Sequence, residues 1–324
     1  MKVLVTGASG FTANYLIKHL LSSCEGALQV WGISRSAPKI SHAGCTYIRV
    51  DLNLSEKVED VIKKVSPDAV IHLAGLNRGT LAELLSANVI NTEHLLRAVR
   101  EGRPDARVLV VGSSAEYGYA GDTPITEDKP LRPVGAYGIS KVAADLLAFQ
   151  YYTTHGLGVA VARPFNLIGP GQADSFICGK LSRQATEIRN GIREAFEIDG
   201  GNARRDFVDV RDAVDAYWRL LSHEHFEQRV AGRAFNVGSG KSYSVTDVIQ
   251  EISVITGRSY KSRIPALPVR ELVPVQIADT TLIQKETGWR NSTPFQRSLK
   301  EMIEDITHST NSQFPKPHRL EQPR

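Results

Sequence analysis

Short apolar runs and helix-length amphipathic stretches alternate along the N-terminal half of the chain. The runs are rich in valine and isoleucine and lie at Val3–Val5, Val30–Ile33, Tyr47–Val50, Ala69–Leu73, Val108–Val111 and Val159–Ala162. Such continuity is typical of strands that are buried on both faces of a parallel sheet. Amphipathic stretches between the runs include Tyr15–Leu21, Ser55–Val65 and Asn91–Val99. The alternation predicts an α/β fold with a doubly wound parallel sheet and right-handed crossovers.

The pattern changes after Phe165, where a glycine- and proline-rich loop begins a region of helices and irregular chain. One more apolar run, Ala234–Val237, is expected to return to the main sheet or to pack at its edge. We therefore predict a first domain of residues 1–165 plus about 233–242. A smaller C-terminal lobe would comprise residues 166–232 and 243–305. The polar residues 306–324 are expected to form a mobile tail.

Composition and charge narrow the class of protein. Of the 324 residues, 42% are hydrophobic and 23% are charged, as in soluble globular proteins. The net charge of +4 is small and spread along the chain, so it does not predict nucleic-acid binding and suits a small anionic ligand equally well. No apolar run approaches the roughly 20 residues of a membrane helix, so no membrane partner is expected.

The cysteines and the N-terminal residues indicate in which cellular compartment the protein is expected. Cys24, Cys45 and Cys178 are odd in number, lie far apart and lack metal-ligand spacing. Neither a disulfide framework nor a metal site is therefore expected. Since the first residues read as a strand and a turn rather than a signal peptide, we predict a cytoplasmic protein.

A glycine-containing turn follows the first predicted strand. Gly7 can take the tight turn, Gly10 lets the backbone approach a pyrophosphate, and the N–H groups at Phe11 and Thr12 would face the anion. Ala13 stands at the third position of the fingerprint and still permits close packing of helix and strand. A glycine motif alone also fits an ordinary strand–helix turn, but its place between a strand and a helix predicts dinucleotide binding.

The end of the second predicted strand bears on the choice of cofactor. A carboxylate there would bind the adenosine ribose of NADH, whereas this chain has Ser34 and Arg35. A hydroxyl and a cation favour a 2′-phosphate, so we predict NADPH, with NADH possible and a solvated Arg35 as the alternative. Asp51, with Leu52 beside it, is predicted to contact the adenine, although a helix N-cap is an equal alternative for Asp51.

Tyr137 and Lys141 are four residues apart, which places a phenol and an ammonium on one face of a helix. A nearby cation lowers the pKa of a phenol, so this pair could exchange a proton with a substrate oxygen, and Lys141 could also bind a ribose. The alternative interpretation is that Tyr137 and Lys141 are simply two exposed residues of a helix, without a catalytic role. Ser113 ends the fifth predicted strand, where ligands bind in doubly wound sheets, and could donate a second hydrogen bond.

The sequence resembles the extended short-chain dehydrogenase/reductases of the NAD-dependent epimerase/dehydratase family. The resemblance covers about residues 1–305 and rests first on the glycine turn, Ile71–Gly75, Ser113, Tyr137 and Lys141. Further motifs narrow it to enzymes of nucleotide sugars, most of all the GDP-4-keto-6-deoxy-mannose reductases. These motifs are Glu116–Gly118, Arg163–Asn166, Ile168–Gln172, Arg204–Val210, Asn236–Gly240 and Thr287–Trp289.

The resemblance implies a Rossmann fold, NADPH-dependent reduction of a sugar 4-keto group, and roles for particular residues. Ser113 and Tyr137 would bond the keto oxygen, Tyr137 would supply the proton and Lys141 would assist it. Leu73, Ala74 and Gly75 would line the cofactor. The nucleotide-diphosphate sugar would be bound in the C-terminal lobe and its surroundings by Ser114, Asn166, Lys180, Arg205 and Arg270. A homodimer is the family expectation.

Several alternatives stay open. Taken from the residues alone, Arg205 beside Asp206 is more often a structural ion pair. A 4-epimerase holding NAD would need the same Ser113, Tyr137 and Lys141, although Ser34 and Arg35 weigh against it. A 4,6-dehydratase would need an acid where this chain has Ala115, while Glu116 is expected to point to the other side of an extended chain. A non-catalytic dinucleotide sensor would have no use for the intact catalytic residues. The nucleotide base and the configuration at C4 are left undetermined.

Overall fold

A computed structural model of the chain describes residues 1–23, 28–198, 201, 203–263 and 271–313. Its main element is a seven-stranded sheet in the order β10-β6-β5-β4-β1-β2-β3, in which every neighbouring pair is parallel. The strands are β1 (Lys2–Thr6), β2 (Gln29–Ser34), β3 (Cys45–Arg49), β4 (Ala69–His72), β5 (Arg107–Val111), β6 (Val159–Pro164) and β10 (Ala234–Val237). The chain runs outward in both directions from β1 and β4, so the predicted doubly wound topology is confirmed.

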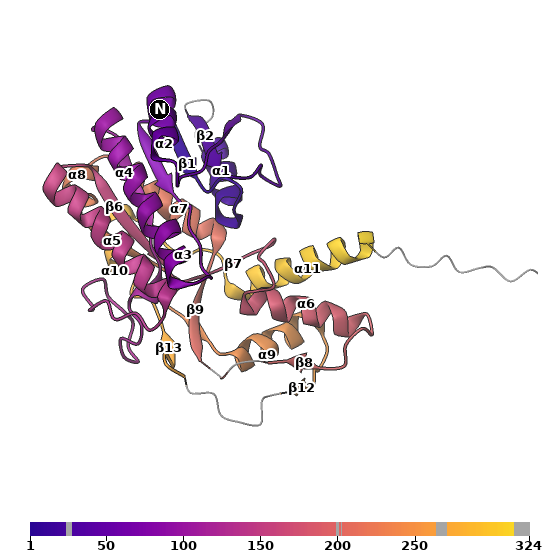
Figure 1. Cartoon of the computed structure of the whole chain (residues 1–324). Helices are drawn as coiled ribbons and strands as arrows, with labels where there is room; N and C mark the ends of the chain where they lie inside the picture. Colours follow the sequence, from indigo (N-terminus) through magenta and orange to yellow (C-terminus); the bar gives the residue numbers. More distant parts are fainter. Residues whose placement is uncertain (24–27, 199–200, 202, 264–270, 314–324) are drawn as a thin grey trace, which may run out of the picture. The chain divides into compact units, whose positions relative to one another are not determined.

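Helices cover both faces of this sheet (Figure 1). One face packs on α1 (Phe11–Ser23) and α7 (Val210–Leu221), and the other on α2 (Ser55–Val65), α4 (Asn91–Gly102) and α5 (Ala136–His155). Helix α2 shows why the sequence folds this way, since its buried residues recur at helical spacing and form one apolar stripe. These residues are Val58, Val61, Ile62 and Val65.

Shorter elements complete this part of the chain. They are α3 (Leu81–Leu85), the π-helix η1 (Ser86–Ile90), the 3₁₀-helix η2 (Ser114–Glu116), α8 (Phe226–Arg229) and α10 (Thr281–Thr287). A second sheet is centred on β9 (Arg204–Asp209), which pairs with β7 (Asn166–Ile168), β11 (Ser242–Tyr243) and β13 (Val275–Gln276). Because β9 leads directly into α7, this sheet is attached to the main core.

The chain divides into two compact units. The first consists of Met1–Leu167, Ala203–Tyr243 and Glu271–Thr293, and the second of Ile168–Asn202, Ser244–Arg270 and Pro294–Arg324. The second unit contains α6 (Ile177–Arg189), β8 (Phe196–Glu197), α9 (Val245–Thr256), β12 (Ser262–Arg263) and α11 (Phe295–Gln313). Among the described residues, no helix combines the length and hydrophobicity that crossing a bilayer requires.

This division differs from the predicted one in two segments. Residues 203–232 and 271–293 belong to the first unit, because side chains such as Val208, Val214 and Tyr217 lie in the same core as Val3 and Leu16. Hydrophobic positions on β9 and α7 do not reveal from the sequence which core they join. Residues 306–313 of the predicted tail belong to α11, and the rest of it lies outside the described residues.

Candidate active site

The turn between β1 and α1 has the geometry of an anion-binding turn. Gly7 adopts a left-handed φ of 68°, and a Cβ there would lie 2.9 Å from the Cα of Ala74. The Gly10 N–H donates to the Gly7 carbonyl at 2.9 Å, and α1 then begins at Phe11 with no acidic residue in its first turn. First-turn N–H groups, here including those of Phe11 and Thr12, lack intrahelical partners. The turn therefore fits a pyrophosphate at the helix N-terminus.

Ser34 and Arg35 lie beside this turn. Ser34 ends β2 and donates to the Ser36 carbonyl at 2.7 Å, and the Ser36 hydroxyl donates to that of Ser9 at 3.2 Å. Arg35 is exposed, and its carbonyl accepts a 2.9 Å hydrogen bond from Nε of Arg49, a second exposed arginine. Two cations therefore stand at the strand ends next to the turn. The sequence offered no sign of Arg49, because its proximity depends on the register of β2 and β3.

Asp51 does not cap a helix. One oxygen of its carboxylate accepts from the backbone N–H and the side-chain amide of Asn53, at 3.0 and 2.9 Å, and the N-cap of α2 is Leu54. The N-cap alternative for Asp51 is therefore wrong, since Asp51 stabilises the turn before the helix. Leu52 beside it is buried, and the adenine contact of both residues stays a prediction.

The end of β4 and helix α5 approach each other at Gly75. A Cβ on Gly75 would lie 2.6 Å from Oδ1 of Asn88 and 3.8 Å from Nζ of Lys141. The Lys141 ammonium donates to the Val111 carbonyl at 2.7 Å. Burial lowers the pKa of Lys141, and the Glu116 carboxyl opposes this effect. Lys141 thus lies beside the segment Leu73–Gly75, as expected of a residue next to a bound cofactor.

The side chains of Ser113 and Tyr137 lie close enough for the Ser113 hydroxyl to act on the pKa of the Tyr137 phenol. Ser113 is the N-cap of η2, and its hydroxyl accepts from the Ala115 N–H at 3.2 Å, which leaves the hydroxyl proton for another partner. The pKa of Tyr137 is raised, because burial and the Glu116 carboxyl outweigh the opposing effect of Ser113. Tyr137 therefore keeps its proton at neutral pH, and the expected lowering of its pKa by Lys141 stays a prediction.

A buried chain of hydrogen bonds links the β1–α1 turn to α5. His72, at the end of β4, is bonded through Nδ1 to the Thr6 hydroxyl at 2.7 Å and through Nε2 to the Thr92 hydroxyl at 3.0 Å. Thr92 donates onward to the carbonyl of Asn88 at 2.7 Å, so it accepts from Nε2, and Nδ1 accepts from Thr6. Burial lowers the pKa of His72 to about 3. His72 is therefore a neutral interior histidine with both ring nitrogens hydrogen-bonded.

The same chain ends at the candidate proton donor. The Asn88 amide donates to the Ser140 hydroxyl at 2.9 Å, and Ser140 donates to the Tyr137 carbonyl at 2.8 Å. Sequence reasoning missed Asn88 and Ser140, because neither residue type signals a role without its neighbours. Their contacts fix the first turns of α5, where Tyr137 and Lys141 lie.

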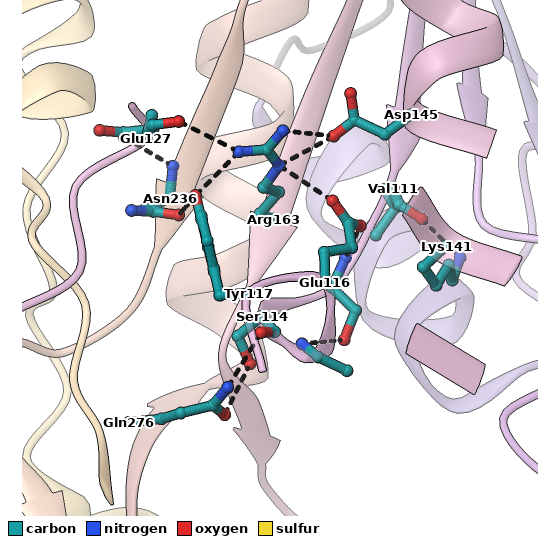
Figure 2. A network of polar contacts seen from close by, with 12 residues as sticks. Val111, Ser114, Glu116, Tyr117, Glu127, Lys141, Asp145, Arg163, Asn236 and Gln276 are labelled. Atoms are coloured by element: carbon teal, nitrogen blue, oxygen red, sulfur yellow. Dashed lines mark hydrogen bonds and ion pairs between the residues drawn. The ribbon is translucent and has the colours of Figure 1, made fainter. Parts of the chain in front are cut away.

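Glu116 points into the interior, as Figure 2 shows. Its Oε1 accepts from the Ser113 N–H at 2.7 Å, and its Oε2 lies 3.0 Å from Nε of Arg163. The backbone here is a 3₁₀-helix, so the expectation of an extended chain is wrong, and the Glu116 side chain is fully buried. The neighbouring Ala115 occupies the position that would carry an acid in a 4,6-dehydratase. That position therefore has no ionisable group in this chain.

The predicted substrate residues fall into separate places. Asn166 on β7 donates to the Asp206 carbonyl at 3.0 Å, so Asn166 and Arg205 lie on paired strands. Ser114 is buried against Gln276, to which its hydroxyl donates at 3.4 Å. Lys180 belongs to α6 in the second unit, and Arg270 lies outside the described residues.

Arg205 is not the ion-pair partner of Asp206. The Asp206 carboxylate accepts hydrogen bonds of 2.7 to 3.0 Å from Ser239, Gly240 and Ala278. The Arg205 guanidinium donates instead to the neighbouring Arg204 carbonyl at 3.0 Å. Burial lowers the pKa of Arg205, and Glu271 opposes this effect. A partly buried cation of this kind suits an anionic ligand.

Residues 3–238 match the NAD dependent epimerase/dehydratase family. The chain belongs to this family. Two curated relatives of the family span nearly the whole chain. The GDP-6-deoxy-D-mannose reductase of Pseudomonas aeruginosa is 31% identical over 320 residues, which cover 94% of this chain and 96% of the relative. The UDP-glucose 4-epimerase of Halalkalibacterium halodurans is 28% identical over 341 residues, with coverage of 98% and 97%.

A solved structure of the epimerase/dehydratase type agrees with the fold. The structure of RMD from Pseudomonas aeruginosa complexed with NADPH is 29% identical, has a TM-score of 0.81, and covers 95% of this chain and 99% of that one. The predicted family, the Rossmann fold and the class of NAD(P)-dependent enzyme are thereby confirmed. Because the relatives include both a reductase and an epimerase, membership in the family does not fix the reaction. The predicted homodimer stays a prediction.

Proposed function

We propose that the chain is an NADPH-dependent reductase of the C4 keto group of a nucleotide-linked 4-keto-6-deoxy-hexose, of the GDP-4-keto-6-deoxy-mannose type. The observation that carries this proposal is the proximity of Ser113 and Tyr137, with the Tyr137 phenol protonated at neutral pH. A reductase needs a proton donor in that state. The 31% identity to a GDP-6-deoxy-D-mannose reductase supports the same reaction.

Each of the candidate catalytic side chains would have its own role in the reduction of the keto group. Ser113 and Tyr137 both donate to the keto oxygen, and Tyr137 gives up its proton as negative charge develops there. Lys141 stabilises the resulting phenolate from the same face of α5. The bound dinucleotide supplies the hydride. Ser140 and Asn88 keep the start of α5 in place throughout.

NADPH is the proposed cofactor because two cations stand where a 2′-phosphate would need them. Arg35 and Arg49 are both exposed at the ends of β2 and β3, and the Ser34 hydroxyl is close to them. Guanidinium groups bind phosphate oxygens strongly through paired hydrogen bonds. The complex of RMD from Pseudomonas aeruginosa with NADPH supports this choice. Gly7, Gly10, Phe11 and Thr12 would hold the pyrophosphate.

The substrate would be held by residues on paired strands. Arg205 on β9 would neutralise the diphosphate, and Asn166 on β7 would hydrogen-bond the sugar or the diphosphate. Lys180, Ser114 and Arg270 remain proposed contacts on the basis of the family resemblance alone. The base of the nucleotide is taken to be guanine, following the reductase relative.

Epimerisation at C4 is a second candidate function. The observation that favours it is the 28% identity to a UDP-glucose 4-epimerase over nearly the whole chain. The same Ser113, Tyr137 and Lys141 would suffice if an oxidised cofactor stayed bound. Dehydration is disfavoured, because Ala115 has no acid and Glu116 is engaged with Ser113 and Arg163.

The test is incubation with NADPH and GDP-4-keto-6-deoxy-mannose, followed by the loss of cofactor absorbance. We expect one equivalent of cofactor to be oxidised for each sugar reduced, and faster turnover with NADPH than with NADH. Replacing Tyr137 by Phe should lower turnover by about 10² to 10⁴-fold, as expected for loss of a general acid. Binding of NADPH to the variant, followed by protein fluorescence, should be retained.

Two outcomes would contradict the proposal. Interconversion of two nucleotide sugars without added cofactor would identify an epimerase instead. Normal activity of Tyr137→Phe would exclude Tyr137 as the proton donor.

A further inference from the structure

A buried cluster of charged groups brings Glu116, Asp145 and Arg163 together (Figure 2). Arg163 on β6 contacts two carboxyl groups, with its Nε 3.0 Å from Glu116 and 2.8 Å from Asp145. The side chain of Glu116 is fully buried, and those of Arg163 and Asp145 are nearly so. Two carboxylates and one guanidinium carry a net charge of −1. One proton on the pair would make this cluster neutral.

The carboxyl groups of Glu116 and Asp145 are within hydrogen-bonding distance of each other. Two carboxyl oxygens attract each other only when one of them carries a proton. Asp145 accepts a hydrogen bond from Nε of Arg163 at 2.8 Å, and a terminal nitrogen of Arg163 forms an ion pair with it at 2.7 Å. Glu116, which has only the 3.0 Å ion-pair contact with Nε of Arg163, is thus the better site for the proton.

The chain provides space for the Glu116 carboxyl. Gly112 leaves open the space that Oε1 of Glu116 occupies as it accepts from the Ser113 N–H. The position therefore accommodates the side chain of residue 116 beside the Ser113 N–H. Ala115, by contrast, presents no carboxyl group.

The charge of Glu116 reaches the candidate catalytic residues. Its carboxyl interacts electrostatically with both Tyr137 and Lys141 on α5. The titratable and charged groups around Glu116 come from three directions. They are Arg163 of β6, Asp145, Tyr137 and Lys141 of α5, and Tyr117 of its own segment, with Glu127 beyond Arg163.

We propose that Glu116 is a positioning residue that holds Ser113 through its backbone and, by ionising, sets the pH range in which Tyr137 keeps its proton. The part that concerns turnover rests on the proposed function. Burial and the Asp145 carboxylate, opposed by Arg163, raise the pKa of Glu116 to about 8. Above that pH, a negative charge on Glu116 raises the pKa of Tyr137 and delays loss of its proton.

The variant that separates charge from shape is Glu116→Gln. Its amide oxygen can still accept from the Ser113 N–H, and its amide nitrogen can donate to Asp145, but it never ionises. We expect the alkaline limb of kcat/KM for carbonyl reduction to move to lower pH by roughly one unit, the size of effect that a nearby charge has on a pKa. The plateau of kcat/KM at lower pH should be largely retained.

A matched control is Glu127→Gln. Glu127 is partly buried on the other side of Arg163, and its carboxylate accepts from the Asn236 N–H at 2.8 Å. It exerts no resolved effect on Tyr137. The alkaline limb should stay at its wild-type position in this variant. Equal profiles for wild type and Glu116→Gln, or equal shifts in both variants, would overturn the proposal.

A second measurement uses no substrate and separates this inference from the proposed function. Infrared difference spectra of the wild-type protein should show a carboxylic-acid C=O band that is lost as pH rises through about 8 and is missing from Glu116→Gln. In the NADPH complex, the carbon-13 signal of the Tyr137 ring should titrate at lower pH in Glu116→Gln than in wild type. No such band, or an unchanged Tyr137 titration, would refute the inference. If both spectroscopic results are as expected but the protein reduces no 4-keto sugar, the reductase assignment is wrong and the inference about Glu116 stands.

Discussion

At the scale of single residues, protonation states follow from burial more than from neighbouring charge. His72 accepts from Thr6 and donates to Thr92, which only a neutral ring can do. A proton added to Nδ1 would face the Thr6 hydroxyl, which has its own donor in the Ala74 N–H at 3.1 Å. Charging His72 would therefore break the link between the β1–α1 turn and α4.

Because the His72 ring is neutral in the folded protein, the free energy of unfolding should depend on pH. The pKa of His72 is about 3 in the folded protein and about 6.5 in the unfolded chain, so its stabilisation is complete above pH 6.5 and is lost as pH falls toward 3. Between pH 7 and pH 5, wild type should lose about 2 kcal/mol more unfolding free energy than His72→Gln. Urea unfolding can be followed by the fluorescence of Trp31, Trp218 and Trp289, which lie in the same unit as His72. Equal pH dependence in both proteins would show that His72 does not titrate this way.

The candidate catalytic residues could be found from the sequence, but their protonation could not. The spacing of Tyr137 and Lys141 and the position of Ser113 at a strand end follow from local pattern. The raised pKa of Tyr137 depends on burial and on Glu116, which lies 21 positions earlier in the chain. Arg49 was missed for a similar reason, since only strand register places it beside Arg35.

At the scale of elements, the β1–α1 turn has a strict steric requirement at Gly7. Replacing Gly7 by Ala would combine a left-handed φ of 68° with a Cβ 2.9 Å from the Ala74 backbone. We expect a loss of roughly 2 kcal/mol of unfolding free energy or more, and loss of NADPH binding, because backbone on both sides must shift. Urea unfolding and cofactor titration measure the two effects.

Gly156→Ala is the matched control for Gly7→Ala. Gly156 has a similar φ of 66° but no atom within 4 Å of its Cβ position, so only backbone strain is added. Its cost should be near 1 kcal/mol, with NADPH affinity unchanged. If both variants behaved alike, the close approach of the turn to Ala74 would not matter.

Most strands of the main sheet were predictable because they are continuous apolar runs buried on both faces. The predicted run Tyr47–Val50 was displaced by one to two residues from β3, which spans Cys45–Arg49. This strand lies at the sheet edge, where burial is incomplete and the apolar signal is weak. The assignment of β9 and α7 to the smaller lobe failed because amphipathicity shows that a face is buried, but does not show which core buries it.

At the scale of the whole molecule, each described residue proposed to contact a ligand belongs to one of the two units. The proposed cofactor contacts and the candidate catalytic residues belong to the first unit, as do Asn166 and Arg205. Lys180 belongs to the second unit. Family membership followed from motifs spread over most of the sequence, whereas the choice between reduction and epimerisation depends on the state of a few side chains.

Arg205 offers a test of substrate binding that does not depend on turnover. Its partly buried guanidinium loses hydration without gaining Asp206 as a partner, so a diphosphate would restore the lost interactions. At a hundredfold excess over its dissociation constant, GDP should stabilise the wild type by about 2.7 kcal/mol. Arg205→Ala should lose most of this gain while keeping stabilisation by NADPH. Arg204→Ala, which removes an exposed arginine bonded to the Ser242 carbonyl at 2.7 Å, should respond to both ligands like wild type. Undiminished stabilisation of Arg205→Ala by GDP would place the diphosphate elsewhere.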